Sequence, residues 1–132
     1  MAHWLLKTEP GSSGWADLVR DGGTEWDGVR NAAAANHLRA MRDGDLALLY
    51  HSGADKAAVG IVRVAREARK DGADGNWVSV TIEPVALLPR PVTLSAMKTD
   101  PRLAGVAILR RPRLSVSPVG EAEWAVLVAM AE

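Results

Sequence analysis

The chain lacks several residues on which particular protein classes depend. It has no cysteine, so disulfide-stabilised folds and thiolate chemistry are excluded. It has no phenylalanine and one tyrosine, and five tryptophans make up the rest of its aromatic residues. No apolar run reaches the length of a membrane span, and residues 1–4 (MAHW) lack the basic and apolar regions of a signal peptide. We therefore expect a cytoplasmic protein with no membrane association.

Net charge is also absent, because 16 basic and 16 acidic residues cancel. A neutral chain cannot rely on bulk attraction to phosphates, so any contact with nucleic acid has to be local. No metal-ligand spacing, phosphate loop or nucleophile elbow is present, and we expect no metal, no cofactor and no catalytic residue. The length of 132 residues, with 48% hydrophobic and 24% charged residues, predicts one domain spanning residues 1–132 and a monomer.

The hydrophobic pattern predicts short strands alternating with short helices. The expected strands are apolar or alternating runs and cover residues 4–7, 46–50, 57–65, 77–85 and 114–116. The expected helices have apolar residues at helical spacing or a capping residue, and cover residues 32–41, 93–98 and 121–130, with a further short helix capped by Ser12 or Ser13. This mixture predicts an α+β fold around a small β-barrel.

Three breaks in this pattern are also expected. Residues 66–76 are polar and contain glycine, so they are predicted to form a surface loop. Pro84, Pro89 and Pro91 are predicted to end the strand that begins at residue 77. Gly60 is predicted to mark a bend or bulge in its strand.

Residues 24–31 (TEWDGVRN) form the most distinctive stretch of the chain. Asn31 is a good helix N-cap, and the alanines that follow it favour a helix. The helix start therefore presents free N–H groups and the positive end of a dipole beside Trp26 and Arg30. An aromatic face next to that positive end suits a planar, hydrogen-bonding ligand such as a nucleobase.

The order of three sequence blocks resembles a known family. Residues 3–10 (HWLLKTEP), 26–31 (WDGVRN) and 44–52 (GDLALLYHS) are similar to the signature blocks of the EVE domain family. Residues 90–94 and 109–119 also fit that family. The resemblance implies a PUA-like pseudo-β-barrel of five or six strands flanked by short helices, similar to the YTH readers of modified RNA. It implies a non-catalytic module that binds a methylated or hydroxymethylated base in DNA or RNA, flipped out of its strand into an aromatic pocket.

The candidate ligand-binding residues come from the blocks that carry this resemblance and from one further tryptophan. They are Lys7, Trp26, Asp27, Gly28, Val29, Arg30, Asn31, His51, Ser52 and Trp77. Trp26 is the expected stacking partner of the base. Because its neighbours are polar or small, its side chain is expected near the surface, although the residues alone fit a core tryptophan equally well. The other three tryptophans lie on apolar faces and are expected in the core: Trp4, Trp15 and Trp124.

Several of these candidates have structural alternatives. Arg30 can instead form an ion pair, with Glu9, Glu25 or Asp27 as the nearby carboxylates. His51 and Ser52 can satisfy backbone groups of the adjacent loop. Trp77 shares the polar face of its strand, so it is either a second aromatic wall or a cap on the strand end.

Two further features bear on function. The arginines between residues 102 and 113 have no acidic residue among them; they are Arg102, Arg110, Arg111 and Arg113. Arg110, Arg111 and Arg113 are the predicted phosphate contacts, with a solvated surface stretch as the alternative.

The consecutive Lys7, Thr8 and Glu9 resemble the catalytic set of ASCH-type amidohydrolases. Side chains alternate along a strand, so Thr8 would point away from the other two. After modified-base binding and amide hydrolysis, the third function considered for this chain is that of a small-molecule-binding accessory protein.

Overall fold

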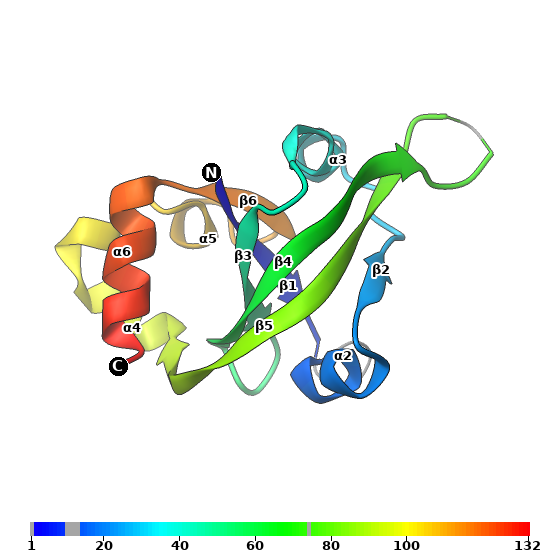
Figure 1. Cartoon of the computed structure of the whole chain (residues 1–132). Helices are drawn as coiled ribbons and strands as arrows, with labels where there is room; N and C mark the ends of the chain where they lie inside the picture. Colours follow the sequence, from blue (N-terminus) through cyan, green and yellow to red (C-terminus); the bar gives the residue numbers. More distant parts are fainter. Residues whose placement is uncertain (1, 10–13, 74) are drawn as a thin grey trace.

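The computed structural model describes residues 2–9, 14–73 and 75–132. Its elements in chain order are β1 (His3–Thr8), α2 (Trp15–Asp21), β2 (Thr24–Trp26), α3 (Ala32–Ala40), β3 (Leu46–His51), β4 (Ala57–Lys70), β5 (Val78–Thr93), α4 (Leu94–Thr99), the 3-10 helix η1 (Pro101–Leu103), α5 (Ala107–Arg110), β6 (Val116–Val119) and α6 (Glu121–Met130) (Figure 1). The α+β class is confirmed.

The six strands form a single sheet in the order β2-β5-β4-β3-β1-β6. β1 and β3 run parallel, and every other neighbouring pair is antiparallel. Register shifts interrupt the β3–β4 and β4–β5 pairings, and such bulges bend a sheet. The six strands and flanking short helices match the expected pseudo-barrel, but β2 and β6 stand at opposite ends of the strand order, so the sheet is open and does not close into a barrel.

Each face of the sheet carries its own hydrophobic core, because successive side chains of a strand point to opposite faces. In β1, Trp4 and Leu6 belong to the first core, which α2 and α3 cover, while Leu5 belongs to the second. The second core is covered by α4, η1, α5 and α6, through Met97, Leu103, Ile108 and Leu127. Figure 1 shows these C-terminal helices grouped at one end of the molecule, away from α2 and α3.

The β4–β5 hairpin is longer than the sequence predicts. β4 continues to Lys70, so the loop expected from residue 66 is wrong over residues 66–70. β5 runs through Pro84, Pro89 and Pro91, which were expected to end it. β2 pairs only with residues 80–82 of β5, so the later part of β5 has a neighbouring strand on one side alone. An edge of that kind tolerates prolines, because no partner there needs their missing N–H.

Local backbone chemistry accounts for two helix starts and one close contact. Gly14 occupies the N-cap of α2, and its N–H donates to Asp17 Oδ2 at 3.2 Å; Ser12 and Ser13, the expected caps, lie outside the described residues. Thr93 caps α4 as predicted, accepting from the Ala96 N–H at 3.0 Å. Gly60 sits at a register shift, as predicted, and a Cβ atom at this position would lie only 2.3 Å from the Trp15 ring, so the close packing of Trp15 requires glycine here.

The remaining differences are small. The last strand starts at Val116 rather than at residue 114, and the single turn of α5 was not expected. None of the described helices is long and apolar enough to cross a membrane.

Candidate nucleic-acid interface

The side chain of Trp26 belongs to the core and also lines a cavity. β2 pairs with β5 so that Trp26 lies opposite Val80, and the tryptophan is 9% exposed. The expectation of a loop side chain near the surface is therefore wrong, because strand pairing holds this residue against the first core. Trp26 also lines a cavity of about 150 Å³ together with Thr8, Glu25 and Asp27. We call this space the tryptophan cavity.

Glu25 is fixed in the wall of the tryptophan cavity by three donors. Arg66 and Ser79 donate to its Oε2, and the hydroxyl of Thr81 donates to its Oε1 at 2.7 Å. Burial alone would raise the pKa of this carboxyl, but the three hydrogen bonds and the charge of Arg66 outweigh burial and lower the pKa to about 2. Glu25 is therefore an ionised carboxylate at neutral pH.

Asp27 differs from Glu25 because it is exposed and forms no hydrogen bond or ion pair within the described part of the chain. Its neighbour Val29 is 8% exposed and packs in the first core, so it anchors the segment rather than presenting a side chain to a ligand. Asp27 therefore lines the tryptophan cavity with a carboxylate that has no partner among the described residues.

A second cavity, of about 350 Å³, lies at the start of α3. It is lined by Asn31, Arg111, Pro112, Arg113 and Leu114, and we call it the arginine cavity. Asn31 is the N-cap of α3 as predicted, since its side-chain oxygen accepts from the N–H of Ala34 at 2.9 Å. Arg111 and Arg113 are exposed, and neither is paired with a carboxylate among the described residues. The lining thus offers two guanidinium groups to an anionic ligand.

Arg110 and Arg102 differ from the two arginines of this cavity. Arg110 is exposed at the end of α5 and is not among the residues that line the cavity. Arg102 is paired with Asp100 at 2.7 Å, so its charge is already balanced. Of the arginines predicted to contact phosphates, the structure brings Arg111 and Arg113 together in one cavity.

Lys7 connects the two cavities through the main chain. Its ammonium donates to the carbonyl oxygen of Pro112, and its backbone N–H donates to the carbonyl oxygen of Ser115 at 2.9 Å. Lys7 therefore holds the loop that lines the arginine cavity, while the next residue, Thr8, lines the tryptophan cavity. Burial and then the positive charge of Arg111, in the same loop, lower the pKa of His37 on α3.

Asp71, at the tip of the β4–β5 hairpin, holds the segment between the two cavities. Its Oδ2 accepts from the N–H of Gly28 at 2.9 Å and from Nη1 of Arg30 at 3.0 Å. These bonds, the Gly28 N–H first, lower the pKa of Asp71. Gly28 has a φ of +72°, a conformation that favours glycine. The carboxylate partner of Arg30 is thus Asp71, rather than one of the nearby carboxylates that the sequence suggested.

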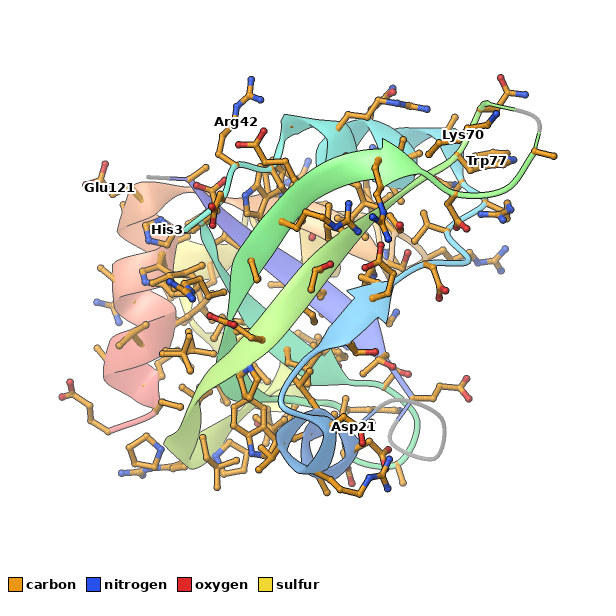
Figure 2. The ribbon with its side chains drawn as sticks, turned by 45° about the vertical axis from the view of Figure 1, so that its right-hand side comes forward. His3, Asp21, Arg42, Lys70, Trp77 and Glu121 are labelled. Carbon is orange, nitrogen blue, oxygen red and sulfur yellow. The ribbon has the colours of Figure 1, made fainter. Side chains whose placement is uncertain are left out.

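Trp77 contacts Arg30. It precedes β5, is half-buried, and lies with its ring centroid 5.6 Å from the guanidinium carbon of Arg30, a cation–π contact. Figure 2 shows Trp77 beside Lys70 at the outer end of the hairpin. The residues that line the tryptophan cavity do not include it. The structure therefore places Trp77 at a strand end against Arg30.

His51 and Ser52 satisfy loop groups, as their structural alternative predicted. His51 Nε2 accepts from the backbone N–H of Trp15 at 3.1 Å, which leaves Nδ1 to donate to Asp55 Oδ2 at 3.1 Å. The backbone N–H and the hydroxyl of Ser52 both donate to the carbonyl oxygen of Thr8, at 2.8 and 3.1 Å. Ser52 therefore fixes the backbone at a residue that lines the tryptophan cavity.

The other tryptophans lie in or against the cores, as predicted. Trp4 is buried and donates from Nε1 to Asp45 Oδ2 at 3.0 Å. Trp15 packs against the first core, and Trp124 packs against the second while stacking on His3 with a centroid distance of 4.3 Å.

The family model described as the EVE domain matches residues 2–130. The chain belongs to the EVE domain family. Chicken thymocyte nuclear protein 1 is 30% identical to this EVE domain over an alignment that covers 98% of the chain and 69% of the relative.

Solved structures of relatives share the whole fold. The NMR structure of a Rhodopseudomonas palustris protein is 44% identical, covers 99% of this chain and 93% of its own, and superposes with a TM-score of 0.95. The structure of the human THYN1 protein in complex with 5-methylcytosine-containing DNA is 28% identical in sequence and superposes with a TM-score of 0.91. The match covers 100% of this chain and 98% of the THYN1 chain.

The expected likeness to YTH domains is confirmed at the level of the fold. The YTH domain of the Zygosaccharomyces rouxii MRB1 protein, in complex with N6-methyladenosine RNA, superposes with a TM-score of 0.60 at 13% identity. The match covers 99% of this EVE domain and 86% of the YTH chain.

Sequence reasoning missed three residues of this site: Thr8, Glu25 and Asp71. Thr8 and Glu25 each stand directly before or after a candidate that the motif did contain. Ser79 and Thr81 alternate with apolar residues along β5 and so share one polar face, which was the available signal for a polar partner such as Glu25. No local signal marks Asp71, because it lies 41 positions from Arg30.

Proposed function

We propose that this EVE domain binds nucleic acid carrying a modified base, methylated or hydroxymethylated, and leaves that base chemically unchanged. The base flips out of its strand and stacks against the indole of Trp26 in the tryptophan cavity. The observation that carries this proposal is the make-up of that cavity. An aromatic wall stands beside the polar groups of Thr8, Glu25 and Asp27, a combination that suits a flat ring with a hydrogen-bonding edge.

The phosphate backbone then runs past the arginine cavity. Arg111 and Arg113 are exposed there and unpaired within the described residues, so they can bind phosphates without first breaking an ion pair. The neutral net charge is consistent with this arrangement, because it concentrates phosphate attraction at one place rather than over the surface.

The relatives support the class of ligand. The human THYN1 structure contains 5-methylcytosine DNA, and its fold matches this EVE domain over the full chain. A binding role is also favoured over hydrolysis by the position of Lys7, whose ammonium donates to a main-chain carbonyl oxygen of the arginine-cavity loop. That contact gives Lys7 a structural task in place of the nucleophilic one an amidohydrolase would require.

The test measures the affinity for single-stranded DNA with one central cytosine, 5-methylcytosine or 5-hydroxymethylcytosine. A buried methyl group contributes about 0.8 kcal/mol, so we expect a several-fold preference for a modified base. Trp26→Leu should lose about tenfold in affinity or more, since stacking on an aromatic face is worth about 1–3 kcal/mol. Trp4→Leu is the matched control, because Trp4 is equally buried but does not line the cavity.

Two results would contradict the proposal. Equal affinity of all three probes would remove the preference for a modified base. Chemical conversion of the modified base by the wild-type protein but not by Lys7→Ala, followed by mass spectrometry, would replace binding by hydrolysis.

A further inference from the structure

The tryptophan cavity has spare hydrogen-bond acceptors. An ionised carboxylate only accepts hydrogen bonds, and each of its oxygens has about two lone-pair sites. Glu25 Oε2 already accepts from Arg66 and Ser79, but Oε1 accepts only from Thr81 in the described structure. Asp27 accepts from no described residue, so both of its oxygens are available. The two carboxylates can therefore receive N–H groups from a ligand and can offer it none.

The two carboxylates differ in how far their charge is balanced. Glu25 is paired with Arg66, so a ligand meets a carboxylate that is already largely neutralised. Asp27 has no such partner among the described residues. Asp27 also lines the cavity, and the residue is exposed. Asp27 is accordingly the residue whose charge acts most strongly on the edge of a bound base.

We propose that Asp27, with Glu25 beside it, selects bases that present an exocyclic amino group and rejects bases that present a carbonyl oxygen at the same position. This inference rests on the proposed function, because it names the base edge read in the same cavity. The chosen class contains cytosine and adenine bases, modified or not. The rejected class contains uracil and thymine.

The chemistry of the two base edges carries this selection. Cytosine has an amino group at the position where thymine and uracil have O4, and a carboxylate is a suitable acceptor for that amino group. A hydrogen bond from N–H to a carboxylate is charge-assisted and stronger than one between neutral groups. A carbonyl oxygen in that place would set two acceptors against each other with no proton between them, and each would lose the bond it makes with water.

The experiment uses four single-stranded DNA probes that differ at one central position: cytosine, 5-methylcytosine, uracil and thymine. The pair of 5-methylcytosine and thymine shares the ring methyl and differs at the hydrogen-bonding edge. The pair of 5-methylcytosine and cytosine shares the edge and differs in the methyl. The full chain should bind 5-methylcytosine at least about tenfold more tightly than thymine, the size expected of a good base-edge contact.

Asp27→Asn tests the assignment to that residue. An amide donates as well as accepts, so the variant can satisfy either edge, and the preference for 5-methylcytosine over thymine should fall to within about threefold. Asp43→Asn is the matched control, because it makes the same change of charge at an exposed position in the turn between α3 and β3. It should keep the parent preference. Thermal melting confirms that both variants are folded.

Each remaining outcome counts against a defined part of the account. Equal affinity for 5-methylcytosine and thymine, both above the unmethylated probes, overturns the amino-edge selection and leaves modified-base binding standing. An unchanged preference in Asp27→Asn overturns the role of Asp27. An amino preference without a methyl preference overturns modified-base binding and supports the edge selection. Failure to bind any of the four probes overturns both.

Discussion

The tryptophan cavity and the arginine cavity both include residues of the segment 25–31 but differ in the groups that line them. The first joins an aromatic wall to the carboxylates of Glu25 and Asp27, and its ionised edge repels phosphates. The second joins the cap residue of α3 to the guanidinium groups of Arg111 and Arg113, which attract phosphates. This difference is the basis of our proposal that the base enters the first cavity and the phosphate backbone passes the second. Such a division would let a protein with no net charge bind a polyanion through neighbouring sites of opposite charge.

The two cavities are built from different parts of the fold. The tryptophan cavity lies where β1 and β2 end, so its walls continue from the first core. The arginine cavity is formed mainly by the loop of residues 111–114 and the start of α3. Lys7 joins them, because it precedes Thr8 in β1 and donates to the carbonyl oxygen of Pro112. The first strand is therefore part of the connection between the two cavities.

Truncating Trp26 should give the largest loss of unfolding free energy. A matching truncation in the arginine cavity should have little effect on stability. Trp26→Ala removes a side chain that is 9% exposed in the first core, and such truncations cost about 3–5 kcal/mol of unfolding free energy. Arg113→Ala removes an exposed side chain and should stay within about 0.5 kcal/mol of the parent. Chemical denaturation measures both. A loss below about 1 kcal/mol in Trp26→Ala would show that the tryptophan is not part of the core.

Acid should act on the tryptophan cavity next. The folded-state pKa of Glu25 is lowered from 4.5 to about 2, so its contribution to stability is complete above about pH 4.5 and is lost as the pH falls toward 2. The full shift corresponds to about 3 kcal/mol, which we reduce to about 1–2 kcal/mol because the side chain is 32% exposed. Denaturation between pH 5 and 2 should show this decline in the parent and a flatter profile in Glu25→Gln. Parallel profiles would mean that Glu25 is not a stabilising carboxylate.

Releasing the segment between the cavities should have the smallest effect. Asp71→Asn weakens the bonds to Gly28 and Arg30, one of which is a partly exposed ion pair, so we expect a small loss of stability. Because the same segment carries Trp26 and Asn31, affinity for a modified-base probe should fall by a few-fold. Glu67→Gln, which disturbs the exposed pair with Arg42, is the control and should leave affinity unchanged. A normal affinity in Asp71→Asn would show that both cavities form without this clamp.

Much of the fold follows from local signals that the sequence displays. The apolar run of β3 is buried on both faces of the sheet. Asn31 and Thr93 cap the helices α3 and α4 at the positions that the sequence predicts. The extent of the β4–β5 hairpin does not follow, because it depends on strand pairing rather than on composition. Pro84 is compatible with β5 only because β2 ends its pairing two residues earlier, a tertiary fact.

The candidate site divides in the same way. The motif of residues 26–31 identifies Asn31 as the cap of α3, because a helix cap depends on residues close in sequence, whereas the position of Trp26 depends on its pairing with Val80 of β5. The partners of the charged residues cannot be predicted from the motif. Arg66 lies 41 positions from Glu25 in the sequence, and the β4–β5 hairpin brings its guanidinium to the Glu25 carboxylate, although other basic residues are nearer in sequence. The open sheet likewise depends on which strands pair at the two ends, which residue patterns do not specify.

The division between base and backbone is the central claim, and one set of titrations tests it directly. Affinity for probes carrying 5-methylcytosine or cytosine is measured across a range of salt concentrations for three variants. They are Trp26→Leu, the double variant Arg111→Ala with Arg113→Ala, and Arg102→Ala as a control for charge, since Arg102 is already paired with Asp100. The salt slope reports binding to phosphates, and the ratio of the two affinities reports the base.

The account predicts opposite effects. The double arginine variant should reduce the salt slope by about 1.4, at about 0.7 for each phosphate of a single strand that is no longer neutralised, and keep the preference for 5-methylcytosine. Trp26→Leu should keep the slope and lose the preference, while Arg102→Ala changes neither. If the double arginine variant lost the base preference, or if Trp26→Leu reduced the salt slope to the same extent, the two cavities would act as one undivided site and the account would be contradicted.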